Sequence, residues 1–118
     1  MGEIFLARQG IAGTNRLVVL KRLLPEHAED ADLLAMFVDE ARIAANLAHP
    51  GIVQVHEFGE DGEGHFIVME YVAGHHVGRV LARSLRDHKP IPVRIGAYVV
   101  HEVARALDHV HHARDSAG

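Results

Sequence analysis

The sequence lacks cysteine and tryptophan, and aromatic residues make up only 5% of its 118 positions. Without cysteine, the chain can have no disulfide, no thiolate chemistry and no cysteine-ligated zinc. Its 12 Lys and Arg are outnumbered by 16 Asp and Glu, so there is no basic excess to bind nucleic acid or an anionic membrane. No apolar run approaches the length of a bilayer span, and residues 1–5 lack the basic region of a signal peptide. We therefore expect a protein of the reducing cytoplasm, with no membrane segment in this chain.

The pattern of apolar residues predicts a small α+β fold. Two pairs of alternating segments are each joined by a glycine-containing turn, which is typical of antiparallel hairpins. Aspartates at 30 and 32 are suited to cap a helix that ends before His-Pro-Gly at 49–51. Two further helices follow, and Pro92 fits the first turn of the last one. Strands are expected at 3–8, 17–24, 53–58 and 65–70, and helices at 32–48, 77–87 and 93–113.

A lysine and a glutamate lie on apolar faces without a local partner of opposite charge. Alternation places Lys21 on one strand face with Leu17, Val19 and Leu23. Helical spacing places Glu40 on the apolar stripe of the 32–48 helix, where its neighbours three and four positions away are uncharged. Because a charge on a core-facing stripe needs a partner, we expect Lys21 and Glu40 to pair across a strand–helix interface. If that pair is buried, removing one partner should cost roughly 3–5 kcal/mol.

This arrangement resembles the amino-terminal lobe of a eukaryotic-like bacterial serine/threonine protein kinase. Val-Val-Leu-Lys at 18–21 is similar to the third-strand Val-Ala-Ile-Lys of that family, and Glu40 matches its helix-C glutamate. His-Pro-Gly-Ile-Val at 49–53 is similar to the segment after helix C, and 67–72 resembles the fifth strand and hinge. The resemblance implies a kinase N-lobe at 1–72, with an antiparallel sheet of about four strands and helix C. It also implies, at 73–118, the hinge exit and the first two helices of a truncated helical C-lobe.

The resemblance implies a set of ATP-binding residues. Lys21 would hold the α- and β-phosphates, and Glu40 would fix its position. The other residues have carried-over roles: Gly2 as the last glycine of the phosphate loop, Ile4 and Val19 above the adenine, Met69 as gatekeeper, Glu70 and Val72 as hinge residues whose backbone groups bond the adenine edge, and His76 near the ribose. Val19 departs from the family alanine. Met1 coincides with an internal methionine of the loop pattern, so we expect a start assigned too late or a fragmentary gene.

The sequence predicts an incomplete catalytic apparatus. In the family, a catalytic-loop aspartate accepts the substrate proton, and an asparagine and the Asp-Phe-Gly aspartate hold Mg²⁺. All three would lie beyond residue 118, so the isolated chain is expected to be inactive, with no metal ligands of its own. Glu-Phe-Gly at 57–59 and His-Ala-Arg-Asp at 112–115 only resemble the missing motifs. The complete protein would transfer the ATP γ-phosphate to protein hydroxyls.

Two alternatives remain open from the sequence. One is a noncatalytic pseudokinase-like module that binds nucleotide or protein. The other is a histidine-rich metal-binding protein, because the chain has 11 histidines and His109 and His112 share a helix face.

The last helix also has an apolar stripe that includes Ile95, Val99 and Val103, and we expect part of it to be exposed.

Overall fold

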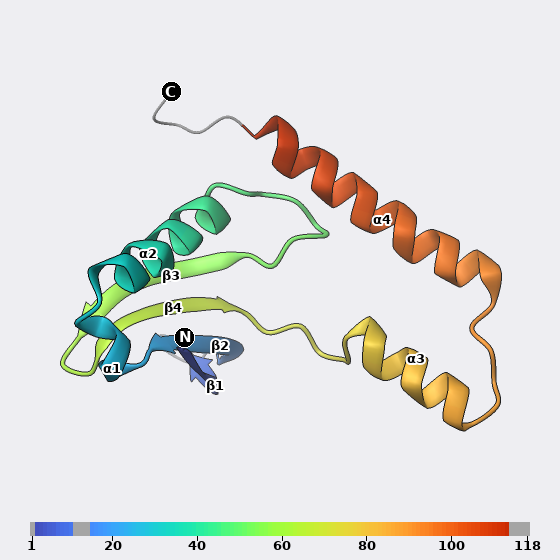
Figure 1. The fold of residues 1–118 in the computed structure, drawn as a ribbon, viewed down its shortest axis with the longest axis horizontal. Coiled ribbons are helices and arrows are strands. Elements are labelled where there is room, and N and C mark those ends of the chain that lie inside the picture. The colour runs from blue at the N-terminus through green and yellow to red at the C-terminus, as the bar shows by residue number, and fades with distance from the viewer. Residues whose placement is uncertain (1, 11–14, 114–118) are drawn as a thin grey trace.

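The computed structural model of the chain describes residues 2–10 and 15–113. The elements follow in the order β1 (Gly2–Gln9), β2 (Arg16–Leu23), α1 (Pro25–Ala28), α2 (Ala31–Ala45), β3 (Val55–Asp61), β4 (Gly64–Glu70), α3 (Val77–Arg86) and α4 (Val93–His112). The strands form one antiparallel sheet in the order β1-β2-β4-β3. Figure 1 shows α1 and α2 beside this sheet, whereas α3 and α4 lie on the right of the view, past the end of β4. The predicted α+β class is confirmed.

The register of the sheet decides which side chains share a face. Lys21 on β2 pairs with Ile4 on β1 and with Ile67 on β4, and Val19 pairs with Met69. Paired residues of antiparallel strands point to the same side, and alternate residues along a strand do as well. All five of these residues therefore belong to one face, which we call the helix face because α2 packs on it.

Helix α2 begins and packs as its sequence predicts. The Asp30 side chain accepts hydrogen bonds from the backbone N–H groups of Asp32 and Leu33, at 3.0 and 3.2 Å, which satisfies two otherwise unpaired donors of the first turn. The stripe of the helix that faces the sheet buries Phe37 completely. The core cluster consists of Leu23, Phe37, Ala41 and Ile67, with Leu34, Val55 and Met69 packed against it.

Several elements differ from the sequence-based expectation. Pro25, expected only to end the second strand, begins the short helix α1, since its fixed φ suits a first helical turn. Strand β3 starts at Val55 and continues to Asp61, because pairing with β4 draws Gly59 and its successors into the hairpin. Helix α2 ends at Ala45, where the Asn46 side chain donates to the Arg42 carbonyl, 3.0 Å away.

An ion pair joins β2 to the tip of the β3–β4 hairpin. The Arg22 guanidinium donates to both carboxylate oxygens of Asp61, at 2.8 and 2.7 Å, and lies 3.3 Å from a carboxylate oxygen of Glu63. The hydrogen bond from Arg22, followed by one from the Glu63 backbone N–H, lowers the pKa of Asp61 to about 2. The same hydrogen bond raises the pKa of Arg22.

The two carboxy-terminal helices present apolar side chains to solvent. On α4, Ile95 and Val103 are each about half exposed, as the stripe in the sequence predicts, and on α3 Val77 and Leu85 are more exposed still. A contact between His49, in the loop after α2, and His109 of α4 links this part to the rest, with ring centroids 5.1 Å apart. Within the described residues, neither of these helices nor any other combines the length and the hydropathy that crossing a bilayer requires.

Candidate functional site

The predicted contact between Lys21 and Glu40 is present. The Lys21 ammonium donates to both carboxylate oxygens of Glu40, at 2.7 and 2.9 Å, across the β2–α2 interface. The pair is only partly buried, because 18% of the Lys21 side chain and 46% of the Glu40 side chain remain exposed, so the cost of roughly 3–5 kcal/mol that would apply to a buried pair does not apply. An ammonium has three N–H donors, so two bonds to Glu40 leave one donor for another acceptor.

The core fixes the position of the Lys21 ammonium. Its nitrogen lies 5.7 Å from the ring centroid of Phe37, within reach of a cation–π contact. Phe37 is fully buried and lies one helical turn before Glu40, so the helical turn that completes the core also presents the carboxylate. The buried Phe37 ring therefore helps to position both the Lys21 ammonium and the helical turn that carries Glu40.

Gly2 lies closer to β2 than any other residue type could. A Cβ at this position would be 2.6 Å from the carbonyl oxygen of Arg22 and 3.5 Å from Cε of Lys21. Since real Cβ atoms are not found so close to backbone oxygen, the first residue of β1 must be glycine to keep this pairing. Because Gly2 has no side chain, its backbone can lie next to the methylene groups of Lys21.

An apolar surface adjoins the ion pair on the helix face. Ile4, opposite Lys21, is 69% exposed, and Val19 and Met69 are partly buried. Leu6, which was not predicted from the sequence, pairs with Val19 and is 61% exposed on the same face. The signal was available, because Leu6 follows Ile4 by two positions on a strand.

The predicted hinge residues lie at the end of β4 and just after it. The backbone N–H of Glu70 donates to the Gln54 carbonyl, at 2.9 Å, so its carbonyl is the group with acceptor capacity toward a ligand. Val72 lies outside any helix or strand and is 62% exposed. His76 caps α3, where its Nδ1 accepts the Arg79 backbone N–H at 3.2 Å.

The histidines near α4 do not form a metal centre. A cavity of about 500 Å³ is lined by residues that include His49, His101, His109 and His112. Within residues 2–10 and 15–113, however, no group of three or more His, Asp or Glu side chains is arranged to hold a metal ion. His112 instead contacts Asp108, one turn earlier, at 3.2 Å. The metal-binding alternative therefore has no site among the described residues.

The site brings together a cation with a spare donor, a side-chain-free backbone segment at Gly2 and an exposed apolar surface at Ile4 and Leu6. Such a site suits a ligand with an anionic end and a flat apolar end. The predicted residues Gly2, Ile4, Val19, Lys21 and Met69 all lie on the helix face.

Comparisons with known proteins match the chain to protein kinases. The family model described as "Protein kinase domain" matches residues 1–114. The chain is 41% identical over 119 residues to Tyrosine-protein kinase MasK of Myxococcus xanthus (strain DK1622), covering 100% of this chain and 18% of that relative. It is 38% identical over 112 residues to Serine/threonine-protein kinase PknJ of Mycobacterium tuberculosis (strain ATCC 25618 / H37Rv), covering 94% of this chain and 18% of that relative.

Solved structures are similar over most of the chain. The crystal structure of the M. tuberculosis PknI kinase domain superposes with a TM-score of 0.69 at 35% sequence identity. The match covers 94% of this chain and 43% of that structure. The chain thus spans less than half of the solved domain, and a much smaller share of the two curated relatives.

Proposed function

This chain belongs to the protein kinase domain family, and from that premise we propose that it is the ATP-binding part of a serine/threonine protein kinase. The observation that carries the proposal is the pair of hydrogen bonds from the Lys21 ammonium to the Glu40 carboxylate on the helix face, beside an exposed apolar surface. The names of PknJ, and of the relatives Pkn3 and PrkC, support transfer to serine or threonine. MasK is named a tyrosine kinase, so the acceptor amino acid is part of the test.

Each site residue has a role in the proposal. The spare donor of Lys21 bonds an α- or β-phosphate oxygen, while Glu40 holds the ammonium in place. The backbone at Gly2 passes over the phosphates, where a side chain would block the approach. Ile4 and Val19 cover one face of the adenine.

The strand end completes the proposed nucleotide site. Met69 borders the proposed adenine site, the Glu70 carbonyl accepts from the adenine amino group, and the Val72 backbone N–H donates to the ring edge. ATP supplies the phosphoryl group that the complete kinase transfers to a protein hydroxyl. In the family, residues of the catalytic loop and of the Asp-Phe-Gly motif hold Mg²⁺. The 118 residues contain neither His-Arg-Asp nor Asp-Phe-Gly, so Mg²⁺ binding is proposed for the complete domain and not for this chain. We therefore propose nucleotide binding without transfer for this chain alone, in a reducing cytoplasm.

Equilibrium binding of a fluorescent ATP analogue tests the nucleotide site. We expect Lys21→Met to weaken binding by about tenfold or more, because a charged hydrogen bond to phosphate is lost. Lys89→Met removes a cation from the loop after α3 and serves as the matched control, with binding unchanged. Equal affinity of the Lys21→Met variant and the unmodified chain would refute the proposed site.

Transfer is tested separately. The longer protein that contains this sequence should phosphorylate a generic protein acceptor from γ-labelled ATP, and phosphoamino-acid analysis should show phosphoserine or phosphothreonine. Nucleotide binding without transfer by that longer protein would favour a noncatalytic module, and phosphotyrosine alone would refute the serine/threonine assignment.

A further inference from the structure

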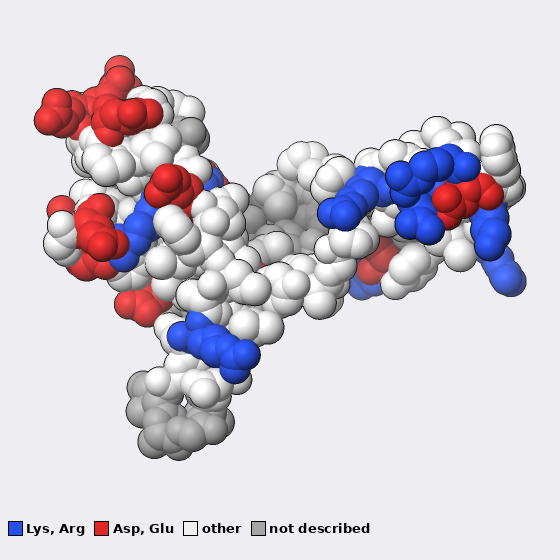
Figure 2. Space-filling view, turned by 90° about the horizontal axis from the view of Figure 1, so that it is seen from below, with Lys and Arg blue, Asp and Glu red and all other residues white. Residues whose placement is uncertain are grey.

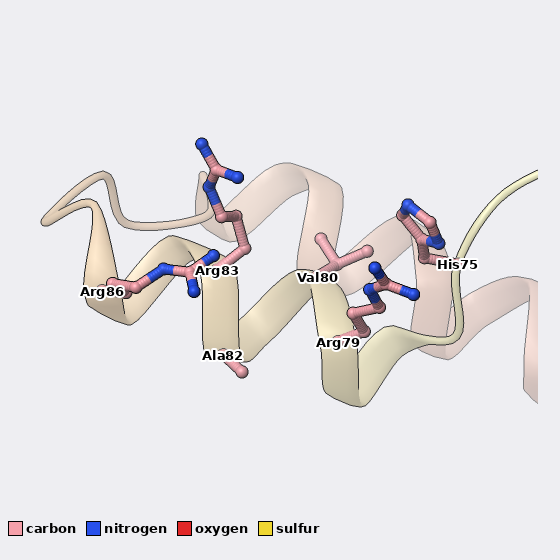
Figure 3. Close-up of a pocket in the computed structure, with 6 residues that line it drawn as sticks. All are labelled: His75, Arg79, Val80, Ala82, Arg83 and Arg86. Atoms are coloured by element: carbon pink, nitrogen blue, oxygen red, sulfur yellow. The ribbon is translucent and has the colours of Figure 1, made fainter.

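Three arginines form a row on α3, away from the site described above. Arg79, Arg83 and Arg86 lie on successive turns of the helix (Figure 3). With His75, Val80 and Ala82 they line a cavity of about 410 Å³, and none of the proposed nucleotide-site residues lines it. We call these six residues the arginine face.

The charge of the chain is strongly divided. Residues 75–94 contain five Lys and Arg and one carboxylate, Asp87, for a net charge of +4. The rest of the chain contains seven Lys and Arg and fifteen Asp and Glu, for a net charge of −8. Figure 2 shows the same division, with basic side chains gathered at the α3 end and acidic ones at the opposite end. The local charge at α3 is therefore opposite in sign to that of the chain as a whole.

Stabilisation of α3 explains why arginines occupy some positions of this row, but not all of them. Arg83 and Arg86 lie in the last turn, where cations interact favourably with the helix dipole, and both contact Asp87. Arg79 lies in the first turn, where a cation is unfavourable and where no acidic residue offsets it. Among the ion pairs of residues 2–10 and 15–113, none includes Arg79. Its position is thus unfavourable for the helix by itself, which points to a ligand.

We propose that the arginine face binds an acidic, carboxylate-rich polypeptide segment in an extended conformation. The arginines are separated by rises of about 6 and 4.5 Å along the helix axis. Alternate side chains of an extended peptide are separated by about 6.6 Å, so carboxylates at alternate positions can reach successive guanidinium groups. Val80 and Ala82, which line the same cavity, provide apolar contact for the methylene groups of the side chains that carry those carboxylates.

The charge distribution favours a short peptide over larger polyanions. A nucleic acid or an anionic membrane extends well beyond one helix and would approach the acidic remainder of the chain, which repels it. Asp87, which follows Arg86 at the C-cap of α3, would likewise face any continuous sheet of phosphates. A short peptide whose carboxylates reach only Arg79, Arg83 and Arg86 contacts the arginine face and no other part of the chain. This binding is independent of the proposed nucleotide site.

The test measures binding of a fluorescein-labelled peptide with glutamates at alternate positions, by fluorescence anisotropy. The probe for charge is the same peptide with glutamine in place of glutamate. The test variant is Arg79→Gln/Arg83→Gln/Arg86→Gln, since glutamine is nearly as good a helix former as arginine. The matched control, Arg8→Gln/Arg42→Gln/Arg105→Gln, removes the same charge from exposed positions elsewhere. Circular dichroism and thermal melting check that both variants fold.

We expect the α3 variant to bind the glutamate peptide at least about tenfold more weakly, and the control variant to stay within about twofold of the unmodified chain. Binding should weaken as salt is added, and the glutamine peptide should bind no better than the α3 variant binds the glutamate peptide. Lys21→Met should leave peptide affinity unchanged, which separates this proposal from the nucleotide site. Equal losses in both triple variants, or tighter binding of duplex DNA or phosphatidylserine vesicles than of the peptide, would overturn it.

Discussion

The Lys21 ammonium on β2 and the Glu40 carboxylate on α2 share two hydrogen bonds, although 19 positions separate them in the sequence. The contact is partly open to solvent, which limits its contribution to stability and leaves the ammonium accessible. Its place between the core and the exposed surface suits a pair that binds a ligand.

Removing either partner should therefore affect nucleotide binding more than folding. We expect Lys21→Met or Glu40→Gln to lower the free energy of unfolding by about 1 kcal/mol, since solvent screens the half-exposed carboxylate. A double-mutant cycle in urea measures the coupling. A loss of several kcal/mol in either single variant would indicate a pair that behaves as buried.

Gly2→Ala should disturb the start of the β1–β2 pairing. The added methyl would overlap the Arg22 carbonyl oxygen, so we expect a loss of about 1–3 kcal/mol and weaker nucleotide binding. Gly62→Ala is the matched control, because a Cβ there meets nothing within 4 Å. Urea unfolding and ATP-analogue titration of both variants give the comparison, and equal behaviour would contradict the close approach.

Phe37→Ala should be severely destabilising. The ring is fully buried in the core and also lies beneath the Lys21 ammonium. We expect a loss of about 3–5 kcal/mol in the free energy of unfolding, from lost burial and the cavity left behind. Met36→Ala, one residue earlier and 57% exposed, should have a much smaller effect. Similar midpoints of unfolding for the two variants would rule out this description of the core.

The Arg22–Asp61 pair should make stability depend on acidity. Because the pKa of Asp61 is lowered to about 2 in the folded chain, its contribution is present above the ordinary carboxyl pKa of about 3.9 and is lost as the pH falls through 2. Asp61→Asn should lower stability at neutral pH and flatten its dependence between these two pKa values. Chemical denaturation across this range gives the measurement, with Asp39→Asn as the control. An unchanged slope in the Asp61→Asn variant would contradict the ion pair.

The sequence indicated the type of each main element, because alternation, helical periodicity and turn residues are properties of neighbouring positions. It identified Lys21 and Glu40 through the mismatch between their charge and their apolar faces. It missed helix α1, since Pro25 can either end a strand or begin a helix, and only the packing around it selects between them.

What the sequence alone determined is therefore local: four strands, their hairpin turns, the amphipathic α2 and an unpartnered lysine and glutamate. Tertiary structure decided the exposure of the Lys21–Glu40 pair, the ion pair of Arg22 with Asp61 and the extension of β3 through Gly59. The physical reason is that strand register and helix docking are set by contacts between distant segments, and a shift of one residue would move every side chain to the opposite face.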